Sequence, residues 1–319
     1  MDPNVFETAN AGFAQALYED YLRDPQAVPE EWRALFASGR VGERPAPGSG
    51  NGAAKMDRAD KADTTDTAPD APKGGTLIKG PAARLVANMN ESLTVPTATS
   101  FRELPVRELE TRRAALNARL KAAGRPEKVS FTHLIGWALI QATKQHPMMG
   151  HALAKVGDDN YRIEPEGISL GLAVDVERKD GSRGLVVPVL KRAEAMDYGA
   201  YHAAYESVVE KARTHKLMPD DFAGATMTLT NPGGLGTVAS VPRLMAGQGT
   251  IIAVGSIGYP PEFATVPKER IAELGISKVM TITSTYDHRV IQGAESGEFL
   301  RTVDQLLQGA DGFYEGVAT

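Results

Sequence analysis

The feature that most constrains this chain is a long stretch, from Gly39 to about Gly75, built from Gly, Ala, Pro, Asp, Thr and Lys with almost no large apolar side chain. Such a stretch cannot bury enough apolar surface to offset the entropy lost on ordering, which predicts a flexible linker. The chain is therefore expected to have three parts: a short N-terminal unit at residues 1–39, the linker at 40–76 and a large domain at 77–319.

The N-terminal unit is predicted to form two short amphipathic helices. Asp24-Pro25 should end the first helix, and Pro29 should begin the second. Apolar residues at helical spacing define the two buried faces: Phe13, Leu17 and Tyr21 in the first helix, and Trp32, Leu35 and Phe36 in the second. Two short helices cannot bury so many aromatic rings by themselves, so the unit is expected to dock on another surface. A hairpin packed on its own chain is the alternative to docking on a partner.

Composition excludes several classes of protein. The chain has 319 residues, of which 42% are hydrophobic, and this is enough for one large domain with a substantial core. A net charge of −5 gives no reason to expect nucleic acid or an anionic membrane as a partner. Neither a membrane-spanning run nor a signal peptide is present, so a cytoplasmic location is expected. Cysteine is absent, which excludes disulfides, thiolate metal sites and a cysteine nucleophile.

The large domain is predicted to mix helices and strands without the regular βαβ period of a doubly wound fold. The expected helices cover residues 107–123, 131–144 and 198–216, and the expected strands cover 168–176, 184–190, 225–230, 250–257 and 279–283. The two strands at 168–176 and 184–190 should form a hairpin through Asp180-Gly181. The segment 241–245 stays unassigned. This pattern predicts an α/β domain with a mixed sheet.

One histidine stands where the last predicted strand ends and a helix begins. His288 lies between Asp287 and Arg289 in the stretch Ser-Thr-Tyr-Asp-His-Arg-Val-Ile-Gln-Gly at residues 284–293. The two flanking charges can hold the local backbone through charge-assisted hydrogen bonds. A lone histidine is most often structural, but this setting is also suited to holding a catalytic base in place.

A second polar stretch lies upstream, at residues 226–234, with the sequence Thr-Met-Thr-Leu-Thr-Asn-Pro-Gly-Gly. It is predicted to be a strand that ends in a hydroxyl group and a tight turn. Strand alternation places Thr226, Thr228 and Thr230 on one face, so only their depth in the sheet separates them.

These two motifs, in this order, resemble those of the dihydrolipoamide acyltransferase family, the catalytic domains of 2-oxo acid dehydrogenase complexes. The resemblance covers roughly residues 77–310 and is greatest to the fused 2-oxoglutarate enzymes of actinobacteria. Residues 10–36 also resemble the N-terminal segment of 2-oxoglutarate dehydrogenases, which tethers that component to a partner subunit. The resemblance implies a chloramphenicol-acetyltransferase-like fold, a homotrimer with its active sites between neighbouring subunits, and succinyl as the acyl group.

The resemblance also implies roles for individual residues. His288 is the expected general base that takes the proton from coenzyme A, since an imidazole with a pKa near 6.5 is mostly free base at neutral pH whereas a thiol near 8.5 is mostly protonated. Thr230 is the expected donor to the oxyanion, with Thr228 as the competing hydroxyl. Asp287, Arg289 and Asn231 are expected to support the site, the first two as a salt bridge that shapes the histidine turn.

One position departs from most of the family. Four residues after the histidine, where Asp or Asn is usual, this chain has Gln292, as the fused actinobacterial branch does. An amide on a longer stem keeps the hydrogen-bonding groups but shifts their reach by one methylene. Gln292 is therefore retained as a candidate site residue whose role stays open.

The expected partners follow from what the chain contains. Coenzyme A is the cosubstrate, and the lipoyl group should arrive on a lipoyl-bearing acyltransferase that works with dihydrolipoamide dehydrogenase. Lys61, in Asp-Lys-Ala, is rejected as a lipoyl lysine because no strands flank it. The thiamine and magnesium signature, Gly-Asp-Gly followed by Asn-Asn, is absent, so the chain is expected to be the front part of a fused enzyme without its thiamine-dependent domain.

Two alternatives remain open. The chain could be a non-catalytic oligomerisation and docking module, for which Gln292 is the best argument, or an acyltransferase for another acyl group. The remaining histidines, His133, His146, His151, His202 and His215, are expected to be structural, because no carboxylate or second ligand lies at metal-binding spacing near them in the sequence. No metal site is expected.

Overall fold

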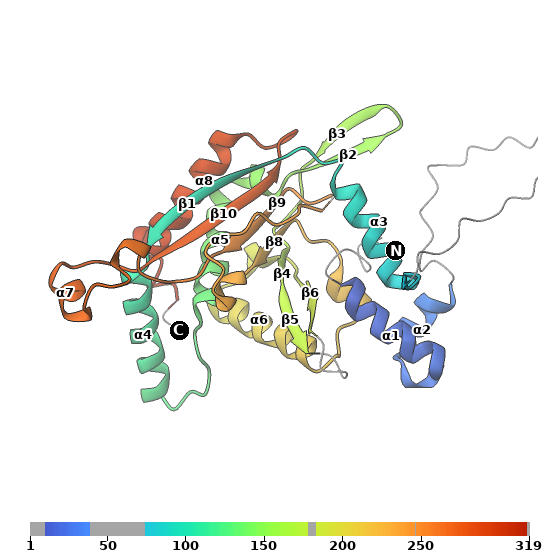
Figure 1. Cartoon of the computed structure of the whole chain (residues 1–319), viewed down its shortest axis with the longest axis horizontal. Helices are drawn as coiled ribbons and strands as arrows, with labels where there is room; N and C mark the ends of the chain where they lie inside the picture. Colours follow the sequence, from blue (N-terminus) through green and yellow to red (C-terminus); the bar gives the residue numbers. More distant parts are fainter. Residues whose placement is uncertain (1–9, 39–73, 178–182, 246, 318–319) are drawn as a thin grey trace, which may run out of the picture.

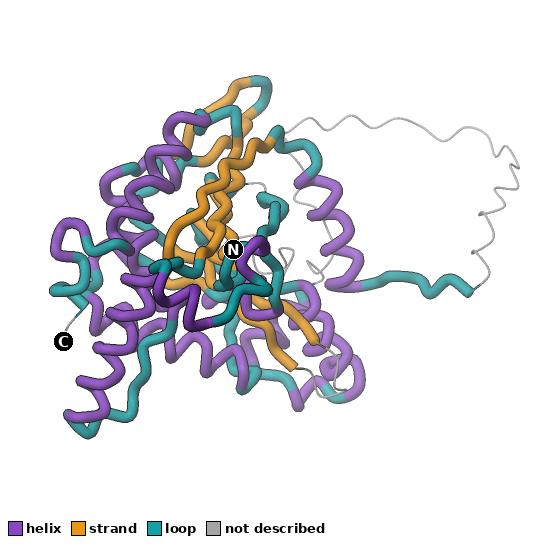
Figure 2. The backbone as a smooth tube through the Cα atoms, turned by 60° about the vertical axis from the view of Figure 1, so that its left-hand side comes forward, coloured by secondary structure: helices purple, strands orange, loops and turns teal. Residues whose placement is uncertain are grey.

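A computed structural model of the chain describes residues 10–38, 74–177, 183–245 and 247–317. Most of the predicted linker, Lys61 included, lies outside the described residues, as do residues 1–9. The remainder forms a twisted mixed sheet with helices packed around it (Figures 1 and 2). No helix in these described ranges is both long enough and apolar enough to cross a bilayer.

The elements follow the predicted order with several additions. The helices are α1 (Ala11–Arg23), α2 (Glu30–Ala37), α3 (Gly80–Ser92), α4 (Arg107–Ala122), α5 (Phe131–Gln145), α6 (Tyr198–Arg213), α7 (Lys268–Glu273) and α8 (Gly293–Leu307). The strands are β1 (Thr97–Pro105), β2 (Ala152–Val156), β3 (Asp159–Ile163), β4 (Leu170–Leu172), β5 (Val174–Glu177), β6 (Arg183–Val186), β7 (Val189–Leu190), β8 (Met227–Thr230), β9 (Thr250–Val254) and β10 (Val279–Asp287).

The main sheet has six strands in the order β1-β10-β9-β8-β4-β7. The pairs β9–β8 and β8–β4 are parallel, and the other pairs are antiparallel. The sheet is therefore mixed, as predicted. Its long strand β10, next to the edge strand β1, ends at Asp287, directly before the candidate histidine.

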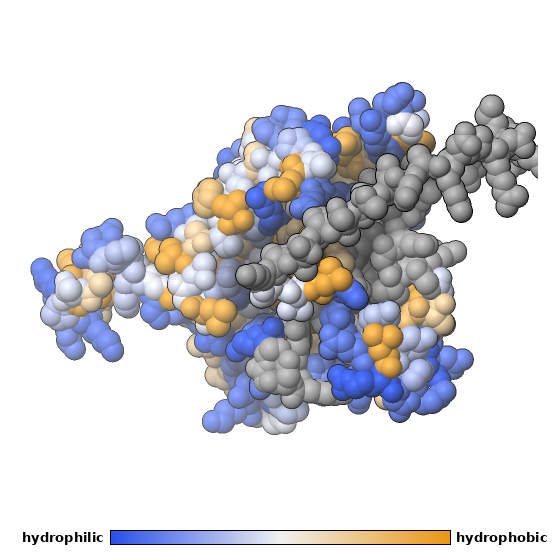
Figure 3. Space-filling view, turned by 45° about the vertical axis from the view of Figure 1, so that its right-hand side comes forward, coloured by the Kyte–Doolittle hydropathy of each residue, from blue (hydrophilic) through white to orange (hydrophobic). Residues whose placement is uncertain are grey.

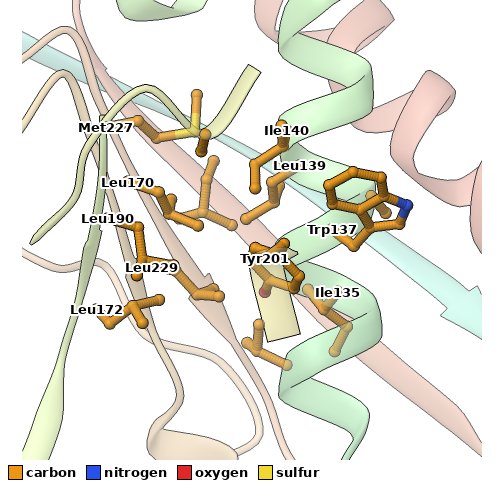
Figure 4. Packing of buried hydrophobic residues seen from close by; sticks show 14 of the residues in the cluster. Ile135, Trp137, Leu139, Ile140, Leu170, Leu172, Leu190, Tyr201, Met227 and Leu229 are labelled. Atoms are coloured by element: carbon orange, nitrogen blue, oxygen red, sulfur yellow. The ribbon is translucent and has the colours of Figure 1, made fainter. Parts of the chain in front are cut away.

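The core lies between this sheet and α5, whose side chains interlock with those of β4, β8 and α6 (Figure 4). Ser130 caps α5 as predicted, since its hydroxyl accepts from the backbone N–H of His133 at 3.1 Å. Gly136 lets Tyr201 of α6 approach closely, because a Cβ at this position would lie 2.3 Å from the Tyr201 hydroxyl oxygen. The Tyr201 hydroxyl donates to the carbonyl of His133 at 3.2 Å, which ties α6 to the first turn of α5.

The predicted hairpin of 168–176 and 184–190 is divided between two sheets. Its inner ends, β4 and β7, belong to the main sheet, whereas β5 and β6 pair separately. The division falls near Pro188, which has no N–H to donate to a neighbouring strand. Ala173 instead donates its N–H to the carbonyl of Leu229 at 2.9 Å. The residues of the turn itself, 178–182, lie outside the described residues.

The N-terminal unit forms the two predicted helices, and they pack on the chain's own large domain. Trp32 is fully buried and donates its indole N–H to the carbonyl of Leu217, 3.0 Å away. Phe13 stacks on His215 and contacts Phe222, with ring centroids 6.0 and 5.9 Å apart. Asn10, at the start of α1, accepts from the N–H of Val187 through its side-chain oxygen at 2.6 Å. The aromatic faces are thus covered within the chain.

Trp32→Ala tests this packing. The substitution removes a fully buried indole and its hydrogen bond, so it should lower the free energy of unfolding by about 3–5 kcal/mol. Urea denaturation followed by circular dichroism measures the effect, with Glu31→Gln, an exposed neighbour on the same helix, as the matched control. A loss below about 1 kcal/mol would show that α2 does not pack on the large domain.

Candidate active site

The turn after β10 is held at both ends by backbone hydrogen bonds. Asp287 donates its N–H to the carbonyl of Gly249 at 3.1 Å, and His288 donates its N–H to the carbonyl of Pro96 at 3.0 Å. The N–H groups of Val290 and Ile291 both return to the carbonyl of Asp287. The backbone that carries the histidine is therefore fixed against two neighbouring segments.

Asp287 and Arg289 form a bidentate salt bridge across this turn. Arg289 donates through Nε and Nη2 at 2.8 and 2.7 Å, and its backbone N–H donates to the same carboxylate at 3.0 Å. The carboxylate is almost fully buried, whereas the guanidinium is about one-third exposed. The hydrogen bond to Asp287 raises the pKa of Arg289, and burial opposes this shift. These three hydrogen bonds from Arg289 to Asp287 fix the conformation of the turn.

The orientation of the His288 ring follows from its backbone contact. Nδ1 lies 3.0 Å from the carbonyl oxygen of Ile291, and a carbonyl can only accept a hydrogen bond. The proton of the neutral ring is therefore on Nδ1, and Nε2 keeps its lone pair. Tyr286 supports the ring from the side in an edge contact, with centroids 5.6 Å apart. His288 itself is exposed, so its free nitrogen can be reached.

Gln292 is the N-cap of α8, four residues after the histidine. Its backbone N–H donates to the carboxylate of Glu295 at 2.7 Å, and its side chain is exposed. The start of α8 is further tied to β10 by the buried hydroxyls of Ser296 and Ser284, which lie 3.0 Å apart. Gln292 is exposed, as His288 is, and it forms a capping box with Glu295 at the start of α8.

The three threonines on the β8 face differ in what their hydroxyls contact. Thr226 bonds to the backbone of Ser169, and the buried Thr228 donates to the side-chain oxygen of Gln248 at 2.9 Å. Thr230 is half-buried, and its hydroxyl has no bonded partner among the described residues. Burial does not separate Thr226 from Thr230, since both are half-buried, but their contacts do: Thr230 is the one whose hydroxyl is available to a ligand.

Asn231 is held directly after Thr230. Its side-chain amide donates to the hydroxyl of Thr132, in the first turn of α5, at 2.9 Å. The turn that ends β8 is therefore tied to the helix that forms the core, which fixes the direction in which the Thr230 side chain leaves the strand.

The structure does not bring His288 and Thr230 together within one chain. In the sheet register, Thr230 pairs with Ala253 of β9, and Ala253 pairs with Thr283 of β10. Thr283 lies five residues before His288. Strands rise about 3.4 Å per residue and lie about 4.8 Å apart, so the two Cα atoms are separated by roughly 20 Å. A site that uses both residues needs the histidine from one chain and the threonine from another.

Sequence reasoning missed a cluster of two buried histidines and an exposed glutamate elsewhere. The ligand atoms of His133, His202 and Glu206 lie within 4.8 Å of one another, although no carboxylate was expected near His133. The neighbours come from α6, about seventy residues later in the chain, and their spacing of four residues on that helix was the available signal. The Nε2 atom of His133 lies 2.9 Å from Glu206, and its ring meets that of His202 edge-on at 4.5 Å.

Existing hydrogen bonds argue against a metal at this cluster. The N–H of Ser130 donates to Nδ1 of His133 at 3.2 Å, so the ring proton is on Nε2 and points at Glu206. His202 uses Nε2 to contact the carbonyl of Lys128 at 3.1 Å. A nitrogen that carries a proton offers no lone pair, so His133 fits its expected structural role better than that of a ligand.

Comparison with known protein families shows which family the chain belongs to. Residues 76–313 match the family described as 2-oxoacid dehydrogenases acyltransferase (catalytic domain). The chain belongs to this family. Residues 4–40 match a second family, the 2-oxoglutarate dehydrogenase N-terminus. The family predicted from the two motifs is thereby confirmed.

Individual relatives agree with this assignment. The acyltransferase chain is 44% identical to a 2-oxoglutarate dehydrogenase E1/E2 component of Corynebacterium glutamicum over 97% of its length, and 51% identical to a multifunctional 2-oxoglutarate metabolism enzyme of Mycolicibacterium vanbaalenii over 76%. It spans only 27% and 19% of those proteins. It also resembles the solved dihydrolipoamide acetyltransferase of Azotobacter vinelandii, with a TM-score of 0.59 and 27% identity, covering 76% of this chain and 97% of that one. The predicted fold class is confirmed.

A pH titration of stability tests the buried cluster. Burial, assisted by the nearby His202, lowers the pKa of His133 to about 4, whereas an unfolded histidine titrates near 6.5. Between these values the folded acyltransferase binds fewer protons than the unfolded chain, so stability should fall as the pH drops through this window and level off below it.

His133→Gln is the variant for this test, because glutamine at this helix position can keep the capping bond to Ser130. From pH 7 to pH 5 the wild type should lose about 1–2 kcal/mol more of its unfolding free energy than the variant does, measured by urea denaturation. Equal losses in the two proteins would contradict the buried, neutral state of His133.

Proposed function

We propose that this chain transfers a succinyl group between dihydrolipoamide and coenzyme A, within a 2-oxoglutarate dehydrogenase system of the tricarboxylic acid cycle. The main observation behind this proposal is the orientation of His288: its Nδ1 is held by a backbone carbonyl, so Nε2 is free to act as a base. The acyltransferase family supports the reaction type. The match of residues 4–40 and the names of the fused relatives favour 2-oxoglutarate chemistry, and with it the succinyl group.

The reaction is a thioester exchange. Nε2 of His288 takes the proton from the thiol of coenzyme A as the sulfur attacks the carbonyl carbon of succinyl-dihydrolipoamide. The carbonyl oxygen becomes an oxyanion and accepts a hydrogen bond from the hydroxyl of Thr230. When the intermediate collapses, the bond between carbon and the lipoyl sulfur breaks, and the imidazolium returns the proton to that sulfur. Succinyl-CoA and dihydrolipoamide leave.

Support for these roles comes from the acetyltransferase of Azotobacter vinelandii. Its structure was studied for the catalytic role of a serine, a histidine and an asparagine, of which the last two lie four residues apart. His288 and Gln292 have the same spacing here. In this proposal, Thr230 supplies the hydroxyl of the serine, and the exposed amide of Gln292 supplies the hydrogen-bonding group of the asparagine. Asp287, Arg289 and Asn231 hold the two motifs in shape.

The proposed site is shared between subunits of a homotrimer. The separation of roughly 20 Å between His288 and Thr230 within one chain requires a second copy. The loop after Thr230 exposes large apolar side chains, with Leu235 80%, Val238 68% and Val241 59% accessible. Apolar side chains gathered in this way favour burial against another protein surface. The neighbouring copy would also exclude water from the exposed His288.

The proposed partners are the lipoyl-bearing acyltransferase that delivers the acyl group, dihydrolipoamide dehydrogenase, and a thiamine-dependent domain that generates the acyl group. Coenzyme A is the cosubstrate. Because α1 and α2 pack on the large domain, any docking role of the N-terminal unit would use the outer surface of the two helices. Truncation of residues 1–39 should weaken assembly with the partners more than it weakens the transfer reaction.

Two alanine variants test the proposal. His288→Ala should abolish succinyl transfer because the base is lost, and Thr230→Ala should slow it by about 10²–10³ because one oxyanion donor is lost. The rate of thioester exchange between succinyl-CoA and dihydrolipoamide, followed by thioester absorbance, gives the comparison. His146→Ala and the exposed Thr214→Ala are matched controls. If both site variants keep more than a tenth of the wild-type rate, the mechanism is wrong.

A further inference from the structure

The hydroxyl of Thr230 opens onto a small cavity of about 260 Å³. Its walls come from the β8–β9 face, the loop between those strands, β6 and the residue after it, α3, and Asn10 at the start of α1. Most of the lining is apolar, with Leu85, Met89 and Val187 among the side chains that face the cavity. An apolar space next to the proposed oxyanion donor is where the acyl chain of a thioester would lie.

The charged side chain that lines the cavity is an arginine. Arg243 lines it, whereas no acidic side chain and no other basic side chain does so among the described residues. Arg243 also has no ion-pair partner in the described part of the chain, since it appears in no salt bridge or hydrogen bond there. An unpaired guanidinium at the rim of an otherwise apolar space favours an anionic ligand.

The loop that carries Arg243 is fixed rather than loosely attached. Thr283 of β10, which is fully buried, donates its hydroxyl to the carbonyl of Ser240 at 2.6 Å. Leu244 and Met245, next to the arginine, are buried. At the far end of the loop, Gly249 approaches the carbonyl of His151 so closely that a Cβ would lie 2.2 Å from the oxygen. Both ends of the loop are therefore anchored, which limits where the guanidinium can reach.

The other polar groups of the cavity are already engaged. Thr228 donates its hydroxyl to the side-chain oxygen of Gln248, and the side-chain oxygen of Asn10 accepts from the N–H of Val187. What remains for a ligand is the Thr230 hydroxyl, the amide nitrogens of Gln248 and Asn10, and the Arg243 guanidinium. These are donors, and they suit oxygens at the two ends of a short aliphatic chain.

We propose that Arg243 binds the terminal carboxylate of the acyl group and so selects succinyl over uncharged acyl groups. This inference rests on the proposed function, because it takes Thr230 to mark the position of the thioester carbonyl. The methylenes of the succinyl group pack on the apolar wall, and Gln248 offers a second donor to the carboxylate. The unassigned segment 241–245 thereby becomes a specificity loop.

Coenzyme A could supply a competing anion through its phosphates. The cavity is smaller than the roughly 300–1,000 Å³ that hold drug-sized ligands, so it fits an acyl group better than a nucleotide. The two sources predict different kinetics. Binding of the acyl carboxylate discriminates between acyl groups, whereas binding of a phosphate affects every acyl group equally and raises the KM for coenzyme A.

Arg243→Met tests the inference in the full chain with two acyl donors, succinyl-dihydrolipoamide and butyryl-dihydrolipoamide, in which a methyl group replaces the carboxylate. For succinyl transfer, kcat/KM should fall about tenfold to a hundredfold, as expected for a lost charged hydrogen bond, and for butyryl transfer it should change less than threefold. Arg243→Lys should recover part of the succinyl rate. Arg270→Met, on α7 at the other side of the molecule (Figure 1), controls for the loss of one positive charge.

Three outcomes overturn the inference. An equal loss for both acyl donors together with a higher KM for coenzyme A assigns Arg243 to a phosphate, and unchanged succinyl kinetics assign it no ligand at all. A selective loss that Arg270→Met reproduces is a general charge effect. Failure of the underlying function looks different, because the wild-type chain would then transfer neither acyl group. Thermal unfolding midpoints of the variants show that they are folded.

Discussion

The register of three neighbouring strands decides how this chain can act. Because β8 runs parallel to β9 and β10 runs antiparallel to it, the threonine motif lies at one end of these strands and the histidine motif at the opposite end. No side-chain movement closes a gap of that size, since it exceeds the length of both side chains together. In the proposed trimer, each chain would offer one half of a site to each of two neighbours. The exposed His288 and the half-buried Thr230, each on a firmly held turn, agree with this proposal.

The two halves are held by different means. A buried carboxylate pairs with Arg289 and sets the histidine turn, and the backbone carbonyl of Ile291 fixes the ring proton. On the other side, the Thr132–Asn231 bond ties the end of β8 to the core helix. The visible surface shows apolar side chains as separate spots among hydrophilic ones (Figure 3). In the proposed trimer, the exposed loop at Leu235, Val238 and Val241 would make the contacts between copies.

Much of this could be predicted from the sequence, because local rules apply to it. Pro25 and Pro29 mark helix ends, Ser130 caps α5, and the alternating pattern before His288 indicates a strand. What failed depends on contacts distant in sequence: the pairing of His133 with Glu206 of α6 and the division of the predicted hairpin at Pro188. The packing of Trp32 on Leu217 agrees with the alternative in which the N-terminal hairpin packs on its own chain. The surface hairpin of β2 and β3 and the helix α3 were also missed, since both have weak apolar periodicity and large exposed side chains such as Tyr161 and Val86.

Complementation between two inactive variants tests the shared site most directly. His288→Ala chains and Thr230→Ala chains would be denatured, mixed in equal amounts and refolded together. Mixed oligomers then contain interfaces at which an intact His288 faces an intact Thr230, so succinyl transfer should return to a substantial fraction of the wild-type rate while each variant refolded alone stays slow. Mixed oligomers that are no more active than the average of the two variants would contradict a site built from two chains.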